Sequence, residues 1–94
     1  MAYHVYLVPY LVQGVYHYYC GYSNHPARRW AQHRAGLGAR CLRGRTLGVP
    51  IILFSFLTRK EAMAQERLIK RYWTHQDKKR HYDLILKQIQ RGDS

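Results

Sequence analysis

The first 22 residues constrain the fold most, because two runs rich in aromatic and β-branched residues follow one another with a short break. Residues 3–10 (YHVYLVPY) and residues 15–22 (VYHYYCGY) have the composition of β-strands. Residues 11–14 allow only a short connection, so we predict an antiparallel hairpin. Pro9 has no backbone N–H to give to a central ladder, so we expect the first strand to end there.

Side chains alternate between the two faces of a strand. Tyr6 therefore shares a face with His4 and Val8, and Tyr19 shares a face with Gly21. A hairpin can bring Tyr6 and Tyr19 side by side, although the sequence does not fix the register.

The middle of the chain predicts a helix, a loop and a third strand. Residues 23–26 (SNHP) place polar capping residues before a proline that is tolerated in a first helical turn, and the helix should run to about Ala35 and stop at Gly36. Residues 36–48 hold four glycines and three arginines, which predicts a flexible basic loop with room for one helical turn. Residues 50–56 (PIILFSF) are continuously apolar, as expected for a strand covered on both faces.

Two further helices complete the predicted order. Thr58 and Glu61 have the spacing of a capping box, and the helix that follows should extend to about Trp73. A last helix is expected over residues 76–90, with Tyr82, Leu84, Ile85 and Ile89 as its apolar positions. The order β-β-α-β-α-α predicts one α/β (α+β) domain over residues 1–94, with a three-stranded mixed or antiparallel sheet flanked by helices.

The charge of the chain predicts a polyanionic partner. Lys and Arg number 16 against 5 Asp and Glu, a net charge of +11. All of these basic residues lie between Arg28 and Arg91. Binding to nucleic acid follows naturally from such a balance. A ribosome-associated protein or one that coats nucleic acid fits the charge as well as an enzyme does.

An anionic membrane is the weaker alternative. No apolar run approaches the roughly 20 residues that span a bilayer, and the N-terminus lacks the basic start and apolar core of a secretory signal. Cys20 and Cys41 do not form a CxxC pair, so we expect free thiols in a reducing cytoplasm. The expected location is intracellular.

Glu66 interrupts the apolar stripe of the helix predicted after Thr58. Ala62, Ile69 and Trp73 recur at helical spacing and should face the core. Glu66 falls between Ala62 and Ile69 on the same stripe. A carboxylate in such a place is expected to be paired or to bind metal. An ion pair with a basic side chain is the structural alternative.

Arg29 and His33 lie four residues apart on one face of the first predicted helix. The guanidinium of Arg29 can hold a phosphate through two hydrogen bonds. The alternative is a solvated basic face shared with Arg28 and Arg34.

The order of these features resembles that of the GIY-YIG nucleases. HVY at residues 4–6 and YCG at residues 19–21 are similar to the two tripeptides that name the family. In the family a helix bearing an arginine and often a histidine follows, as Arg29 and His33 do here. GLGARCLRGR is similar to the basic loop of small members, and TRKEAMAQERLIKRYW resembles the later helix that presents a metal-binding glutamate, here Glu66. The resemblance covers about residues 3–85.

Two positions depart from the family motifs. His4 stands where the first motif has glycine, and Cys20 stands where the second has isoleucine. The tyrosines, the second glycine, the arginine and the glutamate remain. We expect His4 to change how the hairpin sits against DNA without abolishing activity.

The resemblance implies a role for each site residue. Glu66 binds one Mg²⁺ or Mn²⁺ ion, which holds the scissile phosphate and stabilises the leaving 3′ oxygen. Tyr6 is the general base for the attacking water, and Tyr19 orients that water or the phosphate. Arg29 neutralises charge that grows on the phosphoryl oxygens. His33 assists proton transfer through Tyr6 or binds phosphate.

The acidic residues agree with a single ion, because two-metal nucleases need several converging carboxylates and this chain has five acids. Glu61 is assigned to capping, which leaves Glu66 and three aspartates of the C-terminal segment, Asp77, Asp83 and Asp93. The expected contacts to the DNA backbone come from Arg28, Arg34, Arg40, Arg43 and Arg45.

The resulting hypothesis is a metal-dependent DNA endonuclease that is structure-selective or nicking. Its expected substrates are duplex, nicked or branched DNA, as in DNA repair or recombination, with a protein partner as a second source of targeting. A catalytically inactive nucleic-acid-binding protein of the same fold is the alternative. The sequence does not indicate an oligomeric state.

Overall fold

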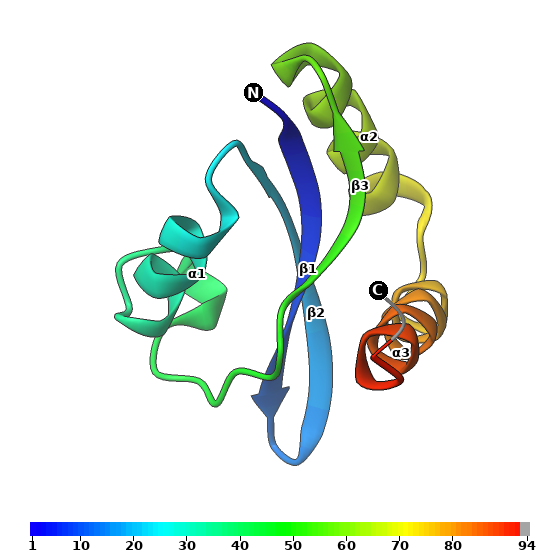
Figure 1. Ribbon diagram of the computed structural model, residues 1–94. Coiled ribbons are helices and arrows are strands. Elements are labelled where there is room, and N and C mark those ends of the chain that lie inside the picture. Colours follow the sequence, from blue (N-terminus) through cyan, green and yellow to red (C-terminus); the bar gives the residue numbers. More distant parts are fainter. Residues whose placement is uncertain (93–94) are drawn as a thin grey trace.

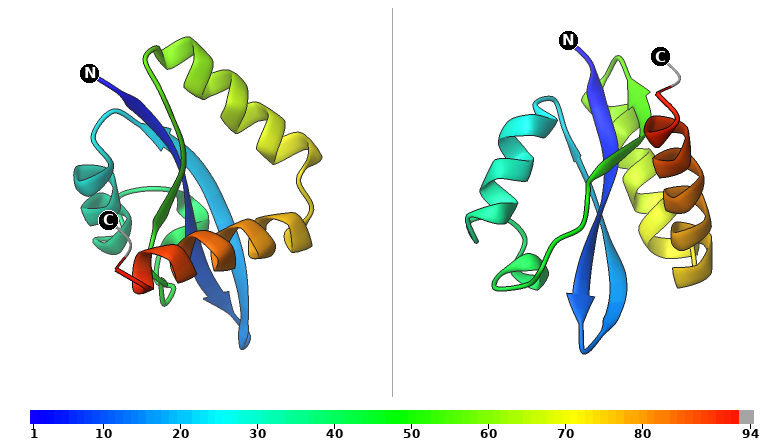
Figure 2. Two further views of the ribbon diagram at one scale, coloured as in Figure 1. Left: turned by 45° about the vertical axis from the view of Figure 1, so that its right-hand side comes forward. Right: turned by 60° about the horizontal axis from the view of Figure 1, so that its bottom comes forward.

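The computed structural model describes residues 1–92 and confirms the predicted element order (Figure 1). Asp93, one of the acids counted above, and Ser94 lie outside the described residues. The sheet is antiparallel, with the strand order β2-β1-β3. The helix α1 lies on one face, and α2 and α3 lie on the other (Figure 2). The elements are β1 (Tyr3–Val12), β2 (Val15–Ser23), α1 (Pro26–Arg34), the short 3-10 helix η1 (Arg40–Leu42), β3 (Ile51–Phe56), α2 (Arg59–Tyr72) and α3 (His75–Gln90).

The predicted hairpin is confirmed, and its turn fixes the register. Gln13 and Gly14 form a two-residue connection with φ angles of 50° and 81°. Positive φ at both central residues is typical of a type I′ turn, whose twist matches that of the flanking strands. Tyr19 pairs with Val8 in the resulting register.

The expectation that β1 ends at Pro9 is wrong, because β1 continues to Val12. The N and O atoms of a strand residue point to the same side. The carbonyl of Pro9 accepts a hydrogen bond from the Gly48 N–H at 2.9 Å, on the side of β1 away from β2. The N–H that proline lacks would point to that same side. Pro9 therefore pairs with Tyr18 of β2 without loss of a ladder bond.

The expectation that the third strand is covered on both faces is also wrong. β3 is an edge strand, and Phe54 and Ser55 on it are exposed. The strand covered on both faces is β1, where residues 5–9 are all buried. A continuous apolar run indicates burial, but it does not distinguish a central strand from an edge strand with aromatic side chains.

The helices start close to the predicted positions, but the predicted capping contacts form only in part. His25, the N-cap of α1, makes no side-chain capping hydrogen bond, and the Glu61 side chain accepts a hydrogen bond from the Thr58 hydroxyl and not from the backbone. Pro26 stands in the first turn of α1, and α2 begins after Thr58, whose hydroxyl oxygen accepts a hydrogen bond from the Glu61 N–H at 3.2 Å. The helix α3 begins one residue earlier than predicted. Thr74 and Asp77 form a complete capping box there, which was not predicted from the sequence.

The predicted apolar face of α3 needs a correction. Tyr82 is buried and Ile85 is half-buried, as expected. Leu84 and Ile89 are exposed instead, and Leu86 packs against the core. α3 crosses the sheet near one end (Figure 2), and only part of its apolar side reaches the core.

The sheet separates two buried clusters. The larger cluster lies under α2 and α3 and includes the predicted stripe residues Ala62 and Ile69, with Trp73 packed against it. The smaller cluster lies under α1 and the basic loop, and it consists of Tyr6, Val8 and Leu42.

Both cysteines are free. Cys20 is buried, and Cys41 is exposed on the basic loop. No helix within residues 1–92 is long and apolar enough to cross a membrane.

Candidate active site

Tyr6 lies at the centre of the smaller cluster and is 1% exposed. Its ring centroid is 6.5 Å from that of Tyr19, which confirms that these two side chains lie side by side. Trp30 of α1 meets the Tyr6 ring edge-on at 6.3 Å. A side chain at Gly21 would place its Cβ 2.6 Å from the Tyr6 hydroxyl oxygen. The glycine of the second motif therefore makes the space in which the phenol sits.

His33 holds the Tyr6 hydroxyl through a hydrogen bond whose direction can be deduced. The His33 Nε2 atom is 2.9 Å from the Tyr6 oxygen, and Nδ1 accepts a hydrogen bond from the backbone N–H of Ala39 at 3.2 Å. A backbone N–H can only donate, so Nδ1 carries no proton. A neutral imidazole then has its proton on Nε2 and donates it to the Tyr6 oxygen. Burial lowers the pKa of His33, and the Arg29 guanidinium lowers it further, which keeps the ring neutral.

The environment of Tyr6 favours the protonated phenol in the free protein. Burial raises the pKa of Tyr6 to about 12, and Tyr19 adds to the rise, whereas the Arg29 guanidinium opposes it. The hydrogen bond from His33 also favours the phenolate. Tyr6 would thus become a base only when additional positive charge approaches it.

Arg29 is half-buried on α1, and one of its terminal nitrogens donates to the Gln32 side-chain oxygen at 3.1 Å. Together with the exposed Arg28 it lines a pocket of about 460 Å³ at the start of α1. Ser23 and Asn24 supply polar atoms to the same pocket. The pocket thus has two arginines in its lining, and a guanidinium group can hold a phosphate through two hydrogen bonds.

The remaining arginines predicted to bind nucleic acid lie at the surface. Arg34 ends α1, and the other three lie on or beside η1. All four are exposed: Arg34, Arg40, Arg43 and Arg45.

The Glu66 side chain is 19% exposed, and its carboxylate forms an ion pair with Lys70 at 3.4 Å. Its negative charge acts on both Tyr6 and Cys20, raising the pKa of each, although burial has the larger effect. The structure thus contains the ion pair foreseen as an alternative, and it also places the carboxylate near the tyrosine cluster.

A metal ion at this place would have one protein carboxylate as a ligand. Within residues 1–92 no group of three or more His, Cys, Asp or Glu side chains converges. Mg²⁺ commonly keeps several waters and binds through one or two carboxylates together with substrate phosphate. Glu66 therefore fits a site that the substrate completes, and it does not fit an all-protein cage.

Sequence reasoning missed two contributors to the site. Lys70 pairs with Glu66, and its ammonium also lies 5.6 Å from the centroid of the Tyr19 ring. Lys70 follows Glu66 by four residues, and this spacing on a helix could have predicted the ion pair from the sequence. The N–H of Ala39, which fixes the tautomer of His33, had no signal in the sequence because it depends on how the glycine-rich loop folds back.

Comparisons with known proteins show which family this chain resembles. A family model described as the GIY-YIG catalytic domain matches residues 2–83. A UPF0213 protein of Nitratidesulfovibrio vulgaris (strain Hildenborough) is 46% identical over 58 residues, which is 62% of this chain and 53% of the relative. A UPF0213 protein of Halobacterium salinarum is 46% identical over 56 residues, which is 56% of this chain and 69% of the relative. The match thus spans about half the length of the first relative. No solved structure matches the chain significantly.

Proposed function

The chain belongs to the GIY-YIG family, and from this premise we propose that it is a metal-dependent endonuclease that hydrolyses phosphodiester bonds in DNA. The observation that carries the proposal is the enclosed Tyr6 hydroxyl, held by a hydrogen bond from a neutral His33 with Arg29 nearby. A phenol needs no such support for packing. Proton transfer requires a fixed hydroxyl whose charged form is stabilised by neighbouring donors and cations.

In the proposed reaction Tyr6 takes a proton from the attacking water, and Tyr19 orients the water or the phosphate. His33 keeps its Nε2 proton and donates a hydrogen bond to the phenolate that forms. Its burial and its two hydrogen bonds favour this role over direct contact with phosphate. Arg29 offsets the charge that develops on the phosphoryl oxygens.

Glu66 would hold one Mg²⁺ or Mn²⁺ ion, which supplies a positive charge for the scissile phosphate and the leaving oxygen. Before any ion binds, Lys70 neutralises the carboxylate. The exposed ammonium of Lys70 can move aside toward solvent, because its side chain is 49% accessible.

The proposed substrates are duplex, nicked or branched DNA, with a role in repair or recombination and targeting by a partner protein. The net charge of +11 supports a polyanionic substrate. The exposed arginines of the basic loop are proposed to bind DNA phosphates beside the cleaved bond.

A metal-dependent cleavage assay tests this function. Supercoiled plasmid and branched duplexes are incubated with the protein in Mg²⁺, in Mn²⁺ and with a chelator. Nicked or cut products that appear only with metal support the proposal.

The Glu66–Lys70 ion pair favours one alternative, an inactive relative that only binds nucleic acid. That alternative predicts that the protein binds DNA but does not cleave it with either metal. It also predicts that Lys70→Met, which frees the Glu66 carboxylate from the ion pair, remains inactive.

A further inference from the structure

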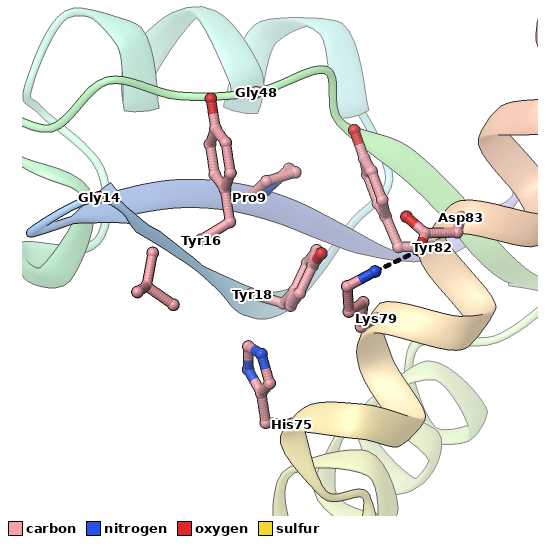
Figure 3. A pocket seen from close by; sticks show the side chains of 10 residues that line it. Pro9, Gly14, Tyr16, Tyr18, Gly48, His75, Lys79, Tyr82 and Asp83 are labelled. Atoms are coloured by element: carbon pink, nitrogen blue, oxygen red, sulfur yellow. Dashed lines mark hydrogen bonds and ion pairs between the residues drawn. The ribbon is translucent and has the colours of Figure 1, made fainter.

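A second pocket lies at the other end of the hairpin, on the face of the sheet that α3 crosses (Figure 3). Its volume is about 530 Å³, within the range of ligand sites in proteins. Three tyrosines and a histidine form much of its lining: Tyr16 and Tyr18 from β2, and His75 and Tyr82 from α3. None of these residues takes part in the mechanism proposed above.

The aromatic walls are held in place. Tyr18 contacts both Tyr82 and His75, with centroid distances of 5.3 Å and 5.6 Å. The Tyr82 hydroxyl donates to the Val49 carbonyl at 2.6 Å, which ties α3 to the segment before β3. Tyr16, by contrast, remains 43% exposed, so one aromatic wall is available to a flat ring.

The charged pair in the pocket offers a donor and an acceptor side by side. Lys79 Nζ lies 2.8 Å from Asp83 Oδ2, and both side chains are about half exposed. The edge of a nucleobase carries neighbouring donors and acceptors in the complementary sense. An aromatic slot with such a pair fits a nucleobase better than a phosphate, because Asp83 would repel an anion.

The pocket and the Tyr6 cluster lie on opposite faces of the sheet, and the basic loop reaches both: Leu47 packs against the Tyr6 cluster, and Gly48 lines the pocket. Tyr19 and Tyr16 lie three residues apart on β2, so their side chains point to opposite faces of the sheet. The basic loop reaches the same end of the hairpin, because the Thr46 carbonyl and the Gly48 N–H form hydrogen bonds with β1.

We propose that this pocket binds an unpaired nucleobase of the DNA substrate, on the face of the sheet opposite the Tyr6 cluster. The proposal rests on the proposed function, since it assumes a DNA substrate, and it adds a reason why an unpaired or branched site would be preferred. A base from a free nucleotide has the same chemistry, so the experiment includes both sources.

The test measures base capture without cleavage. A duplex with one unpaired 2-aminopurine is titrated with the full chain in the presence of a chelator, beside a duplex in which the same base is paired. Stacking in the pocket should quench the unpaired probe, and the protein should bind that duplex about tenfold more tightly. Tyr16→Ala should abolish the quenching and the preference, whereas Tyr16→Phe should retain both because the ring remains.

Tyr72→Ala is the matched control, because Tyr72 is also an exposed tyrosine but lies at the end of α2, outside the pocket. It should behave as the unsubstituted protein does. Lys79→Met provides a second variant at an exposed position should Tyr16→Ala fold poorly, and it should reduce the preference for the unpaired base. Circular dichroism checks the fold of each variant.

Equal affinity for the two duplexes, with no effect of Tyr16→Ala, would overturn the proposal. It would also be overturned if a nucleoside monophosphate bound this pocket as tightly as the unpaired base within DNA. Because a chelator is present, either result leaves the cleavage assay of the proposed function unaffected. A protein that captures the base but never cleaves would instead contradict the endonuclease while retaining this pocket.

Discussion

The two faces of the sheet bury side chains of different chemistry. Under α2 and α3 the buried residues are mainly aliphatic, as with Leu7 and Ile69. Under α1 the centre is the hydrogen-bonded pair of Tyr6 and His33. The indole N–H of Trp30 on that face is buried and has no hydrogen-bond partner among the described residues.

The two faces of the sheet therefore differ in what they contribute: one mainly stabilises the fold, and the other holds the candidate site. Aliphatic burial on the α2 and α3 face contributes most of the hydrophobic free energy of folding, since this contribution scales with apolar area removed from water. The α1 face carries polar groups that are costly to bury and that a purely structural core would replace by apolar ones. Substitutions on the two faces should therefore separate stability from activity.

The largest effect is expected for Glu66→Gln, which removes the carboxylate that reaches from the α2 side toward the tyrosines. Metal-dependent cleavage should fall to background, because an amide is a poor ligand for Mg²⁺. Removal of the ion pair with half-exposed Lys70 should cost less than about 1 kcal/mol of unfolding free energy. Cleavage assays and thermal unfolding measure the two quantities.

Glu61→Gln is the control, since Glu61 lies on the same helix and its side chain accepts a hydrogen bond from the hydroxyl of the capping residue Thr58. If Glu66→Gln lowered the unfolding free energy by several kcal/mol, as breaking a buried ion pair does, and cleavage persisted, Glu66 would be structural.

Arg29→Ala should lower the cleavage rate of bound DNA by about 10²–10³-fold, the range for loss of one group that stabilises transition-state charge. Arg29→Lys should recover little, because a point charge does not reproduce the guanidinium fork. Single-turnover rates at saturating protein measure this effect.

Replacement of the three loop arginines by alanine should act on affinity instead. The salt dependence of binding should flatten by about one unit for each phosphate group that the variant no longer binds. An Arg29→Ala protein that cuts bound DNA at the normal rate would place Arg29 in the binding surface only. The loop residues concerned are Arg40, Arg43 and Arg45.

Tyr6→Phe should lower cleavage by about 10²-fold, the lower range for loss of a general base, with little change in packing. Tyr22→Phe is the matched substitution on the other face. The Tyr22 hydroxyl accepts a hydrogen bond from exposed Arg59 at 3.2 Å, and its loss should leave cleavage unchanged. Equal effects of the two substitutions would remove the difference in role between the faces.

The smallest effect concerns pH. The pKa of His33 is lowered from 6.5, mainly by burial, so the unfolded chain takes up this proton more readily than the folded one. Above about pH 6.5 His33 is neutral in both the folded and the unfolded chain, and it does not lower the unfolding free energy. As the pH falls below that value, the unfolded chain binds the proton first, and the unfolding free energy decreases. The unfolding free energy should therefore fall less between pH 7 and pH 5 in His33→Gln than in the unsubstituted protein. Urea unfolding at both pH values measures the difference, and identical losses in the two proteins would contradict it.

Local signals in the sequence predicted most of the fold. Strand composition indicated the hairpin, and capping residues such as Thr58 located the helix starts. The errors arose where the outcome depends on neighbours far away in the chain. The strand at Pro9 continues because the Gly48 segment lies beside it, and β3 is an edge strand because β1 takes the central place.

The candidate site was predictable only in part for the same reason. The proximity of Tyr6 and Tyr19 follows from side-chain alternation within one hairpin. The donor that fixes the His33 tautomer comes from Ala39, in a loop whose path no periodic pattern encodes.

The contrast between the two thiols gives the molecule a built-in position for a reporter group. Burial raises the pKa of Cys20 to about 12, so almost none of it is the reactive thiolate near neutral pH. Cys41 is exposed within η1, between two of the loop arginines. A maleimide dye should therefore label the unsubstituted chain at Cys41, and its emission would follow the approach of a DNA backbone to the basic loop without any engineered cysteine.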